Sequence, residues 1–389
     1  MFLLTMTSIL SHAKWFGVSV KSCSVFFFWA IIVLILLTAI EVGAIWKVIK
    51  VWMGLDGRSD TLEGSLTIRL AGSIFYGNAF ISLLLLWKLA SSWKMLSIYW
   101  AIAEVNSGLK LPSDSKLRKR IVTVTNFIAI FGVAEHFLSI TGNINFELQT
   151  SGYLQQYILK SHAFLIKPND YNIWLALSIF IVSNLATVLW NFQDLVIILI
   201  SMGLSSRYYR INSYLYDTVK TERRLRNVEK GSTTIYKQQQ TWRRLREAYV
   251  RQAALVRMID RELGALVLLS QINNFYFICL QLYNGLHRST TSLSSHIYYM
   301  SSLGWLLFRA ISVVLAAADV NISSKRALPY LYMCPRSAYN VEIKRLEQQL
   351  THDFVALTGM GFFSLNRKML LEVAGNILKY ELVLIQYDF

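Results

Sequence analysis

Seven stretches of the chain are long and apolar enough to cross a lipid bilayer as α-helices. A hydrocarbon core about 30 Å thick needs about 20 helical residues, because each residue rises about 1.5 Å. The stretches are residues 24–45, 70–91, 121–140, 173–202, 263–285, 298–320 and 369–389. Of the 389 residues, 54% are hydrophobic and only 16% are charged, which is typical of polytopic membrane proteins. We therefore expect an all-α polytopic membrane protein with seven transmembrane helices.

The positions of the Lys and Arg residues predict how these helices are oriented. Loops on the cytoplasmic side retain basic residues. If the N-terminus is cytoplasmic, only seven of the 39 Lys and Arg lie in the outside loops. Arg309 and Lys379 lie deep within spans, and the other 30, including Lys88 at the inner end of the second span, lie on the inside. We expect a multi-pass protein of the plasma membrane with a cytoplasmic N-terminus and an extracellular C-terminus. The net charge of +16 then reflects membrane topology, and we expect no nucleic-acid partner.

The last stretch, residues 369–389, carries polar groups that should not face lipid, among them Lys379, Glu381 and Gln386. An ionisable group in hydrocarbon costs several kcal/mol, so this face must turn toward protein or water. Lys379, Val383 and Gln386 share one face by their helical spacing. We infer that several copies of this helix line a central aqueous path.

The sequence carries no motif that is typical of an enzyme. It lacks HExxH, GxSxG, a glycine-rich phosphate loop and clustered Cys and His with metal-ligand spacing. Glu135 and His136 are neighbours, but adjacent residues on a helix point about 100° apart and do not form a ready-made dyad. We expect no catalytic activity, no metal site and no cofactor.

The outer halves of the second to sixth spans combine aromatic side chains with polar ones. Sugars need both, since rings stack on C–H faces while carboxylates, amides and imidazoles pair with hydroxyls. The alternative is that these residues pack, form interfacial belts or make interhelical hydrogen bonds. The carboxylate of Glu135 needs a partner, which could be His136, Arg309 or a ligand hydroxyl. The candidate ligand-binding residues are Tyr76, Glu135, His136, Trp174, Tyr276, Gln281, Tyr283, Asn284, Trp305 and Arg309.

Residues 379–387, KYELVLIQY, resemble the signature that closes insect gustatory receptors: Thr-Tyr, five mostly apolar residues and Gln-Phe. Lys379 stands where the family usually has Thr, and Tyr387 stands where it has Phe. The segment ELVLIQ within residues 379–387, with residues 356–364 before it, resembles the sugar-receptor branch of that family in particular. Four further segments resemble this branch in order and spacing: residues 74–79, 133–136, 186–194 and 268–279. The resemblance covers nearly the whole chain except the N-terminal tail, which is shorter than this family leads us to expect.

This resemblance implies a tetrameric, ligand-gated, non-selective cation channel, either a homotetramer or a heterotetramer with related receptors. Each subunit would bind a sugar in its own pocket, and the four final helices would form the pore for permeant cations. Gln386 and Tyr387 match the gate positions of the family. The ammonium groups of Lys379 would oppose cation flow unless they lie between subunits, pair with Glu372 or another acid, or border a wide vestibule.

Two cytoplasmic segments, residues 205–262 and 321–368, are expected to form an anchor bundle. Apolar residues recur in them at three- and four-residue steps, as in an amphipathic helix. The other divisions we expect are a short cytoplasmic tail (1–23), transmembrane helices 1–4 on the pocket side (24–204), helices 5–6 (263–320) and the pore-lining helix (369–389).

Three other classes of membrane protein remain as alternatives. The main one is a seven-helix G-protein-coupled chemoreceptor, against which the inferred orientation argues. A secondary transporter usually has repeated halves and interrupted helices, and the sequence shows neither. A non-sensory scaffold has little use for a polar final helix.

Overall fold

The computed structural model describes residues 2–19, 24–53, 66–105, 108–109, 111–112, 114–143, 152–166, 168–224, 232–287, 293–336 and 339–387. In these ranges the regular elements are helices, apart from an isolated bridge between Thr358 and Ser364. The α-helices are α1 (Phe2–His12), α2 (Val25–Trp52), α3 (Leu66–Val105), α4 (Leu117–Asn143), α5 (Tyr153–Ser161), α6 (Ile173–Arg224), α7 (Ser232–His287), α8 (Leu293–Lys325), α9 (Leu328–Tyr332), α10 (Val341–His352) and α11 (Arg367–Tyr387). Short 3-10 helices cover Ala13–Phe16 and Pro168–Asp170.

Six helices of the described chain are long and apolar enough to span a bilayer, namely α2, α3, α4, α6, α7 and α8. They contain the first six predicted spans, so the prediction of an all-helical membrane protein is confirmed. The seventh predicted span forms helix α11. Its crossing of the membrane stays a prediction, because the side chains of its last residues lie outside the described part of the chain.

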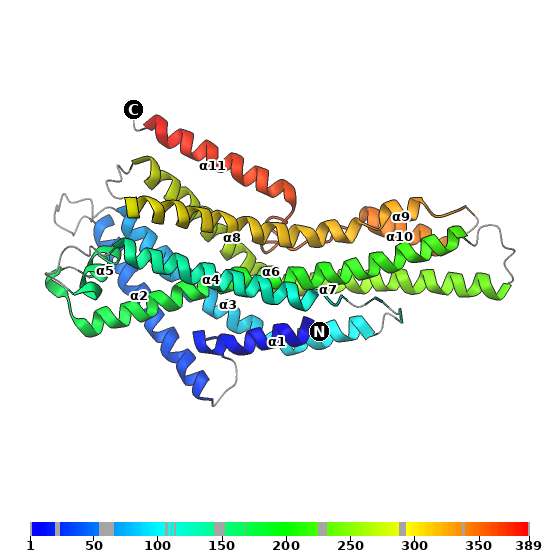
Figure 1. Ribbon diagram of the computed structural model, residues 1–389, viewed down its shortest axis with the longest axis horizontal. Helices are drawn as coiled ribbons and strands as arrows, with labels where there is room; N and C mark the ends of the chain where they lie inside the picture. Colours follow the sequence, from blue (N-terminus) through cyan, green and yellow to red (C-terminus); the bar gives the residue numbers. More distant parts are fainter. Residues whose placement is uncertain are drawn as a thin grey trace.

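The two central helices extend well beyond the thickness of a bilayer. Helix α6 has 52 residues and α7 has 56, which corresponds to lengths of about 80 Å. Both run along the long axis of the molecule, and α9 and α10 lie beside their far ends (Figure 1). The periodic residues Trp242, Leu245 and Tyr249 are all buried there, because they form the apolar stripe by which α7 packs on its neighbours.

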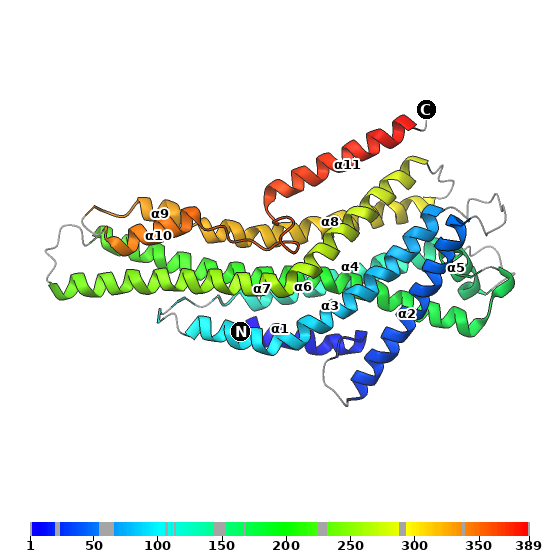
Figure 2. The ribbon, with the colours of Figure 1, turned by 180° about the vertical axis from the view of Figure 1, so that it is seen from behind.

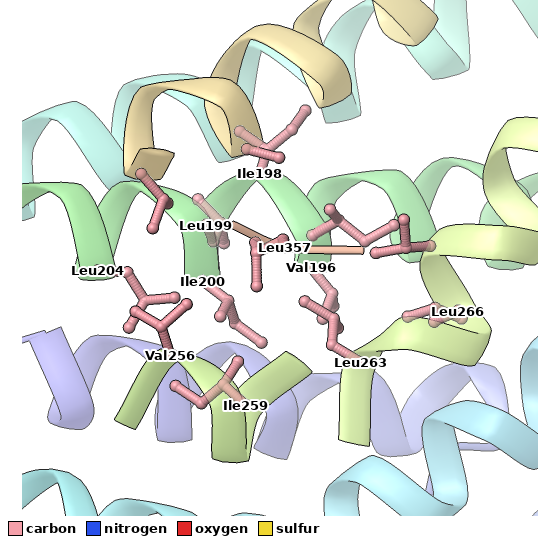
Figure 3. Packing of buried hydrophobic residues seen from close by; sticks show 14 of the residues in the cluster. Val196, Ile198, Leu199, Ile200, Leu204, Val256, Ile259, Leu263, Leu266 and Leu357 are labelled. Carbon is pink, nitrogen blue, oxygen red and sulfur yellow. The ribbon is translucent and has the colours of Figure 1, made fainter. Parts of the chain in front are cut away.

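An apolar contact between α6 and α7 forms the centre of the bundle (Figure 3). It joins Leu199, Ile200 and Leu204 of α6 to Val256, Ile259 and Leu263 of α7, and Leu357 from the segment after α10 packs among them. All of these side chains are buried. Burying one such side chain stabilises the fold by about 1.5–3 kcal/mol, so this contact fixes the two long helices against each other.

Helix α1 packs onto the bundle along α3 and α6. The Phe2 ring stacks on Trp100 of α3 with a centroid distance of 4.6 Å, and the indole Nε1 of Trp93 donates a hydrogen bond to Thr7 Oγ1 at 3.0 Å. Phe2 also lies against Gly203 of α6, where an added Cβ would lie 2.5 Å from the ring. The first residues of the segment expected to be a tail therefore form a docked helix.

Helix α11 stands apart from the bundle in both ribbon views (Figures 1 and 2). Its main contacts are with α7 and α8. Leu371 and Leu378 are 77% and 65% exposed. A single chain therefore leaves much of the apolar surface of this helix uncovered.

Candidate functional site

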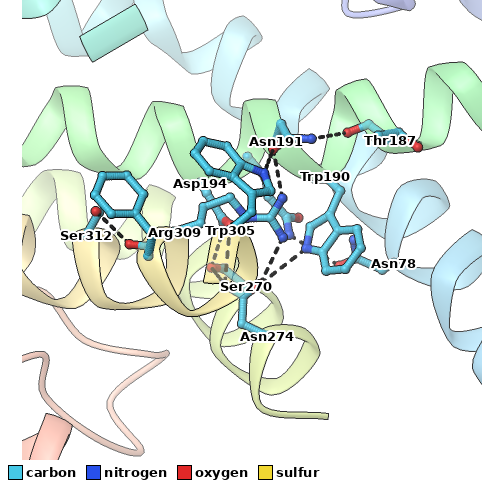
Figure 4. Close-up of polar contacts among 12 residues, drawn as sticks. Asn78, Thr187, Trp190, Asn191, Asp194, Ser270, Asn274, Trp305, Arg309 and Ser312 are labelled. Carbon is cyan, nitrogen blue, oxygen red and sulfur yellow. Dashed lines mark hydrogen bonds and ion pairs between the residues drawn. The ribbon is translucent and has the colours of Figure 1, made fainter. Parts of the chain in front are cut away.

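A buried ion pair joins α6 to α8 inside the helix bundle. Arg309 Nε lies 2.7 Å from Asp194 Oδ2, and the two side chains are 3% and 0% exposed. Two residues of α7 support the carboxylate: Ser270 Oγ donates to Asp194 Oδ1 at 2.6 Å, and Asn274 Nδ2 donates to Asp194 Oδ2 at 3.3 Å (Figure 4). A buried charge pair needs such additional hydrogen bonds to offset the cost of removing both ions from water.

The other side of the guanidinium meets amide and aromatic groups (Figure 4). Arg309 Nη1 donates to Asn191 Oδ1 at 2.8 Å, and its carbon lies 4.3 Å from the ring centroid of Trp190. Trp305 Nε1 donates to the same Asn191 oxygen at 3.3 Å. Phe131 of α4 stacks on Trp305 with a centroid distance of 5.6 Å. Four helices thus contribute to one polar and aromatic cluster.

Glu135 lies beside this cluster and has a side-chain partner on α8. Ser302 Oγ donates to Glu135 Oε1 at 2.8 Å, and Gln281 Nε2 of α7 donates to Ser302 Oγ at 3.0 Å. The sequence suggested His136, Arg309 or a ligand as partner of this carboxylate. The hydrogen bond goes instead to Ser302, which lies one helical turn from Trp305 on the same helix.

A cavity of about 840 Å³ opens between α1, α4 and α6. His136, Asn184, Thr187 and Asn191 line part of it and make that part polar, whereas most of its other lining is apolar. His136 Nδ1 lies 3.5 Å from Thr187 Oγ1. His136 Nε2 is buried and has no hydrogen-bond partner among the described residues.

The structure brings together five of the ten sequence-predicted ligand-binding residues and separates the others. Glu135, Gln281, Trp305 and Arg309 belong to the cluster, and His136 faces the adjoining cavity. Tyr276, Tyr283 and Asn284 lie on α7, partly buried, with Tyr276 packed edge-on against Phe277. Trp174 is 74% exposed at the start of α6. Tyr76 is buried on α3 and belongs to a different set of contacts.

Tyr76 holds a cap that covers the end of the bundle. Its hydroxyl is hydrogen-bonded to His162 Nε2 at 2.9 Å, and Ser161 Oγ to His162 Nδ1 at 2.7 Å. Burial, followed by the nearby His136, lowers the pKa of His162 to about 4. Phe164 packs so closely on Gly72 of α3 that an added Cβ would lie 2.4 Å from its ring. We call α5 and residues 162–166 the α5 cap.

Sequence reasoning missed the polar partners of the cluster: Trp190, Asn191, Asp194, Ser270, Asn274 and Ser302. A signal for them was present. Asp194 is an acid inside an apolar span and Arg309 is a base inside another, so each needed a buried partner of opposite charge. Ser270 and Asn274 also lie one helical turn apart, on one face of α7.

The predicted pore residues all lie on α11. Lys379 is exposed, and the side chains of Val383, Gln386 and Tyr387 lie outside the described residues. Glu372, one of the acids suggested as a partner for Lys379, forms an ion pair with Lys368 at 3.3 Å.

This arrangement of long membrane helices is shared with solved receptor structures. The insect olfactory receptor OR5 from Machilis hrabei aligns with a TM-score of 0.68 and 12% identity, over 99% of this chain and 97% of that chain. The same receptor in complex with eugenol aligns with a TM-score of 0.68 and 12% identity, over 99% of both chains. At this identity the likeness shows the fold alone. The protein is an all-helical, multi-pass membrane protein with the insect olfactory receptor fold.

The sequence comparisons identify the family. Residues 3–389 match the trehalose receptor family, and the chain belongs to this family, which confirms the resemblance to insect sugar receptors. Gustatory receptors for sugar taste 64f and 64a of Drosophila melanogaster are 31% and 30% identical over 81% and 82% of this chain, and 65% and 69% of theirs. Gustatory receptor 5a for trehalose, of the same organism, is 30% identical over 77% of this chain and 65% of its own length. The alignments thus span about two thirds of these relatives. The family is one of receptors and not of enzymes, as predicted.

Proposed function

We propose that this chain is the subunit of a sugar-gated, non-selective cation channel. The observation that carries the proposal is that Ser302 of α8 bonds both Glu135 of α4 and Gln281 of α7, one helical turn from the buried Trp305. Carboxylate, amide and indole groups in one region of the bundle are the combination that a sugar requires. The names of the relatives, which refer to sugar taste and trehalose, point to the same ligand class.

Unpaired polar atoms support a ligand in this region. His136 Nε2 and Gln281 Oε1 are both buried without a hydrogen-bond partner among the described residues. Buried polar atoms almost always have one, so sugar hydroxyls are the missing partners in this proposal. The sugar occupies the polar end of the cavity, where His136 and Asn191 line the wall. Glu135 is the sequence neighbour of His136, and Trp305 bonds Asn191.

The buried ion pair then acts as the rigid base of the pocket. Asp194 and Arg309 have polar partners on three helices, and Arg309 shares the Asn191 oxygen with Trp305. A pocket whose side chains are held in place loses less conformational entropy when it binds.

The segment between α10 and α11 supplies the connection to the pore. Leu357 and Leu365 are fully buried, and Leu365 N–H donates to the Leu357 carbonyl at 2.9 Å, which closes a hairpin. Asn321 Nδ2 of α8 donates to the Val355 carbonyl at 2.9 Å. Because α7 and α8 carry much of the sugar cluster and also hold this hairpin, their movement shifts the base of α11. Sugar opens the channel only to the extent that it binds the open state more tightly.

In the assembled channel, α11 helices from four subunits line the pore. The exposed apolar residues of α11 support this arrangement, because other copies would cover them. Gln386 and Tyr387 form the gate, where a ring of aromatic groups blocks ions by excluding water. Since Glu372 pairs with Lys368, we place Lys379 at the cytoplasmic vestibule or between subunits.

The anchor lies on the cytoplasmic side, which is also where the basic loops place the N-terminus. The described parts of residues 205–262 and 321–368 are the ends of α6, α7 and α8, together with α9, α10 and the segment that follows α10. Arg246 Nε of α7 donates to Glu342 Oε2 of α10 at 2.7 Å, and this hydrogen bond lowers the pKa of Glu342. The anchor holds the inner ends of the spans while their outer ends respond to ligand.

Current recordings from cells that express this chain test the proposal. We expect cation currents with at least one member of a panel of mono- and disaccharides, and altered resting or sugar-evoked current in Gln386→Ala and Tyr387→Ala. Reversal potentials of Lys379→Thr then report whether the lysine lies near the ion path. Normal surface expression with no current for any sugar, alone or with related receptors, would overturn the proposed function.

A further inference from the structure

The apolar part of the cavity between α1, α4 and α6 is a second candidate binding site. Val122 and Ala129 of α4, Val188 and Leu195 of α6, and Leu4 and Ile9 of α1 line it. Helix α1 presents this face to the cavity while its opposite face, which carries Phe2, Met6 and Leu10, is buried. One wall of the groove is therefore formed by a helix that is itself docked on the bundle.

A cluster of cations lies at the end of the groove where α4 begins. Lys116, Arg118, Lys119 and Arg120 immediately precede the apolar span of that helix, and Arg118 lines the groove. Arg120 pairs with Asp114 at 2.6 Å. Arg118 and Lys119 are exposed and form no ion pair with any described residue. Basic clusters directly beside a transmembrane helix attract anionic lipid headgroups.

We propose that this groove binds a phospholipid with an anionic headgroup. One acyl chain lies along the apolar walls between α1, α4 and α6, and the phosphate contacts Arg118 and Lys119. The two ends of the site match the two ends of such a lipid: the walls are mostly apolar, and the groove begins at Arg118, next to Lys119, neither of which is ion-paired within the described chain. Polar side chains are interspersed in these walls, among them Ser8, Thr125 and Asn126, but apolar ones predominate, which suits an acyl chain better than a sugar.

The bound lipid has a consequence for the proposed sugar pocket. The same cavity reaches His136 and Asn191, so an acyl chain in its apolar part closes that pocket toward the bilayer. The leaflet that supplies the lipid follows from the proposed orientation, whereas the binding itself depends on neither the orientation nor the sugar response.

Native mass spectrometry of the purified full-length chain tests the site directly. Phosphatidylserine and phosphatidylcholine with identical acyl chains are offered in competition. We expect wild-type protein to retain phosphatidylserine at least about fivefold better, the factor contributed by one cation near an anionic surface. Arg118→Glu should reduce that preference at least about fivefold, whereas Arg244→Glu, an equal charge change at a residue of α7 that does not line the groove, should preserve it.

A second pair of variants tests the groove rather than the charge. Ala129 and Ala134 are both exposed on α4, but only Ala129 lines the groove. Ala129→Trp should fill it and reduce retention of both lipids, whereas Ala134→Trp should leave retention unchanged. Equal retention of the two lipids by wild-type protein, or equal retention by the two Trp variants, would overturn the proposal. Because no current is measured, either result is separate from failure of the sugar-gated channel.

Discussion

Asp260 of α7 accepts two hydrogen bonds from Thr358, one from the backbone N–H at 2.6 Å and one from the hydroxyl at 2.8 Å. Thr358 opens the tight hairpin turn at Met360 and Gly361, whose φ angles of 53° and 80° lie in the left-handed region. Gly264 of α7 lets this turn approach, since an added Cβ would lie 3.1 Å from the Met360 nitrogen. The chain that leads into α11 is therefore bonded to α7.

Loss of this contact should uncouple sugar binding from channel opening. Hydrogen bonds to a charged group contribute about 1.5–3 kcal/mol, so Asp260→Asn and Thr358→Val should reduce maximal sugar-evoked current by about tenfold or more. Sugar affinity, measured by direct binding, should change little. Thr358→Ser keeps both donors and serves as the control. If Thr358→Val and Thr358→Ser gave equal currents, the hydroxyl would have no part in coupling.

Removing the hydroxyl of Ser302 should weaken sugar binding itself. Ser302→Ala leaves Glu135 without its side-chain donor on α8, and an unsatisfied buried group costs about 1–3 kcal/mol. We expect the sugar concentration for half-maximal current to rise about tenfold. Ser301 is exposed on the same helix, and Ser301→Ala is the matched control. An unchanged response in Ser302→Ala would place Glu135 outside the sugar pocket.

Breaking the buried ion pair should destabilise the fold more than replacing both of its members. Asp194→Asn leaves the Arg309 charge without a counter-ion, which costs about 3–5 kcal/mol. The double variant Asp194→Leu with Arg309→Met leaves no buried charge and should recover most of that loss. Thermal unfolding in detergent measures both. The two single variants Asp194→Leu and Arg309→Met are measured beside the double variant. If the double variant lost as much stability as these two lose in sum, the two charges would contribute independently.

Acid should loosen the α5 cap through His162. Its pKa is about 4 when folded, because burial and then the nearby His136 disfavour the charged ring, against an unfolded value of about 6.5. As pH falls from about 6.5 toward 4, His162 takes up a proton more readily when the cap is detached from the bundle. The free energy needed to detach the cap therefore falls by up to about 3 kcal/mol. After correction for the slower intrinsic exchange of amides in acid, the protection factors of residues 153–166 should be lower at pH 5 than at pH 7.

His162→Gln separates this effect from general acid sensitivity. Glutamine carries no charge at either pH. In this variant the amide protection of residues 153–166 should therefore depend on pH no more strongly than that of α6. Equal pH dependence in the variant and in wild-type protein would exclude His162 as its cause.

Some features of the molecule could be predicted because they depend on local composition. A helix must satisfy its own backbone hydrogen bonds in lipid, so the length of an apolar stretch is enough to indicate a span. The amphipathic row from Trp242 to Leu263 indicated the extension of α7 for a similar reason. Glu135, Gln281, Trp305 and Arg309 could be singled out because polar and aromatic side chains are unusual inside apolar helices.

The pairing of these residues could not be predicted in the same way. Ser302 and Glu135 are 167 residues apart, and Arg309 and Asn191 are 118 apart. The rotation of each helix about its axis decides which residues of two spans meet, and packing with several neighbours sets that rotation. Tyr76 therefore faces His162 of the α5 cap, although we expected it on the same half of the spans as the cluster residues.

The sequence by itself determined the membrane class, the first six spans and the receptor family, because apolar length and family motifs are properties of contiguous residues. Only the tertiary structure decided the partner of Glu135, the ion pair of Asp194 with Arg309, the docking of α1 and the bonding of Thr358 to α7. These contacts join residues far apart in the chain, and they form only when the packing of whole helices brings the residues together.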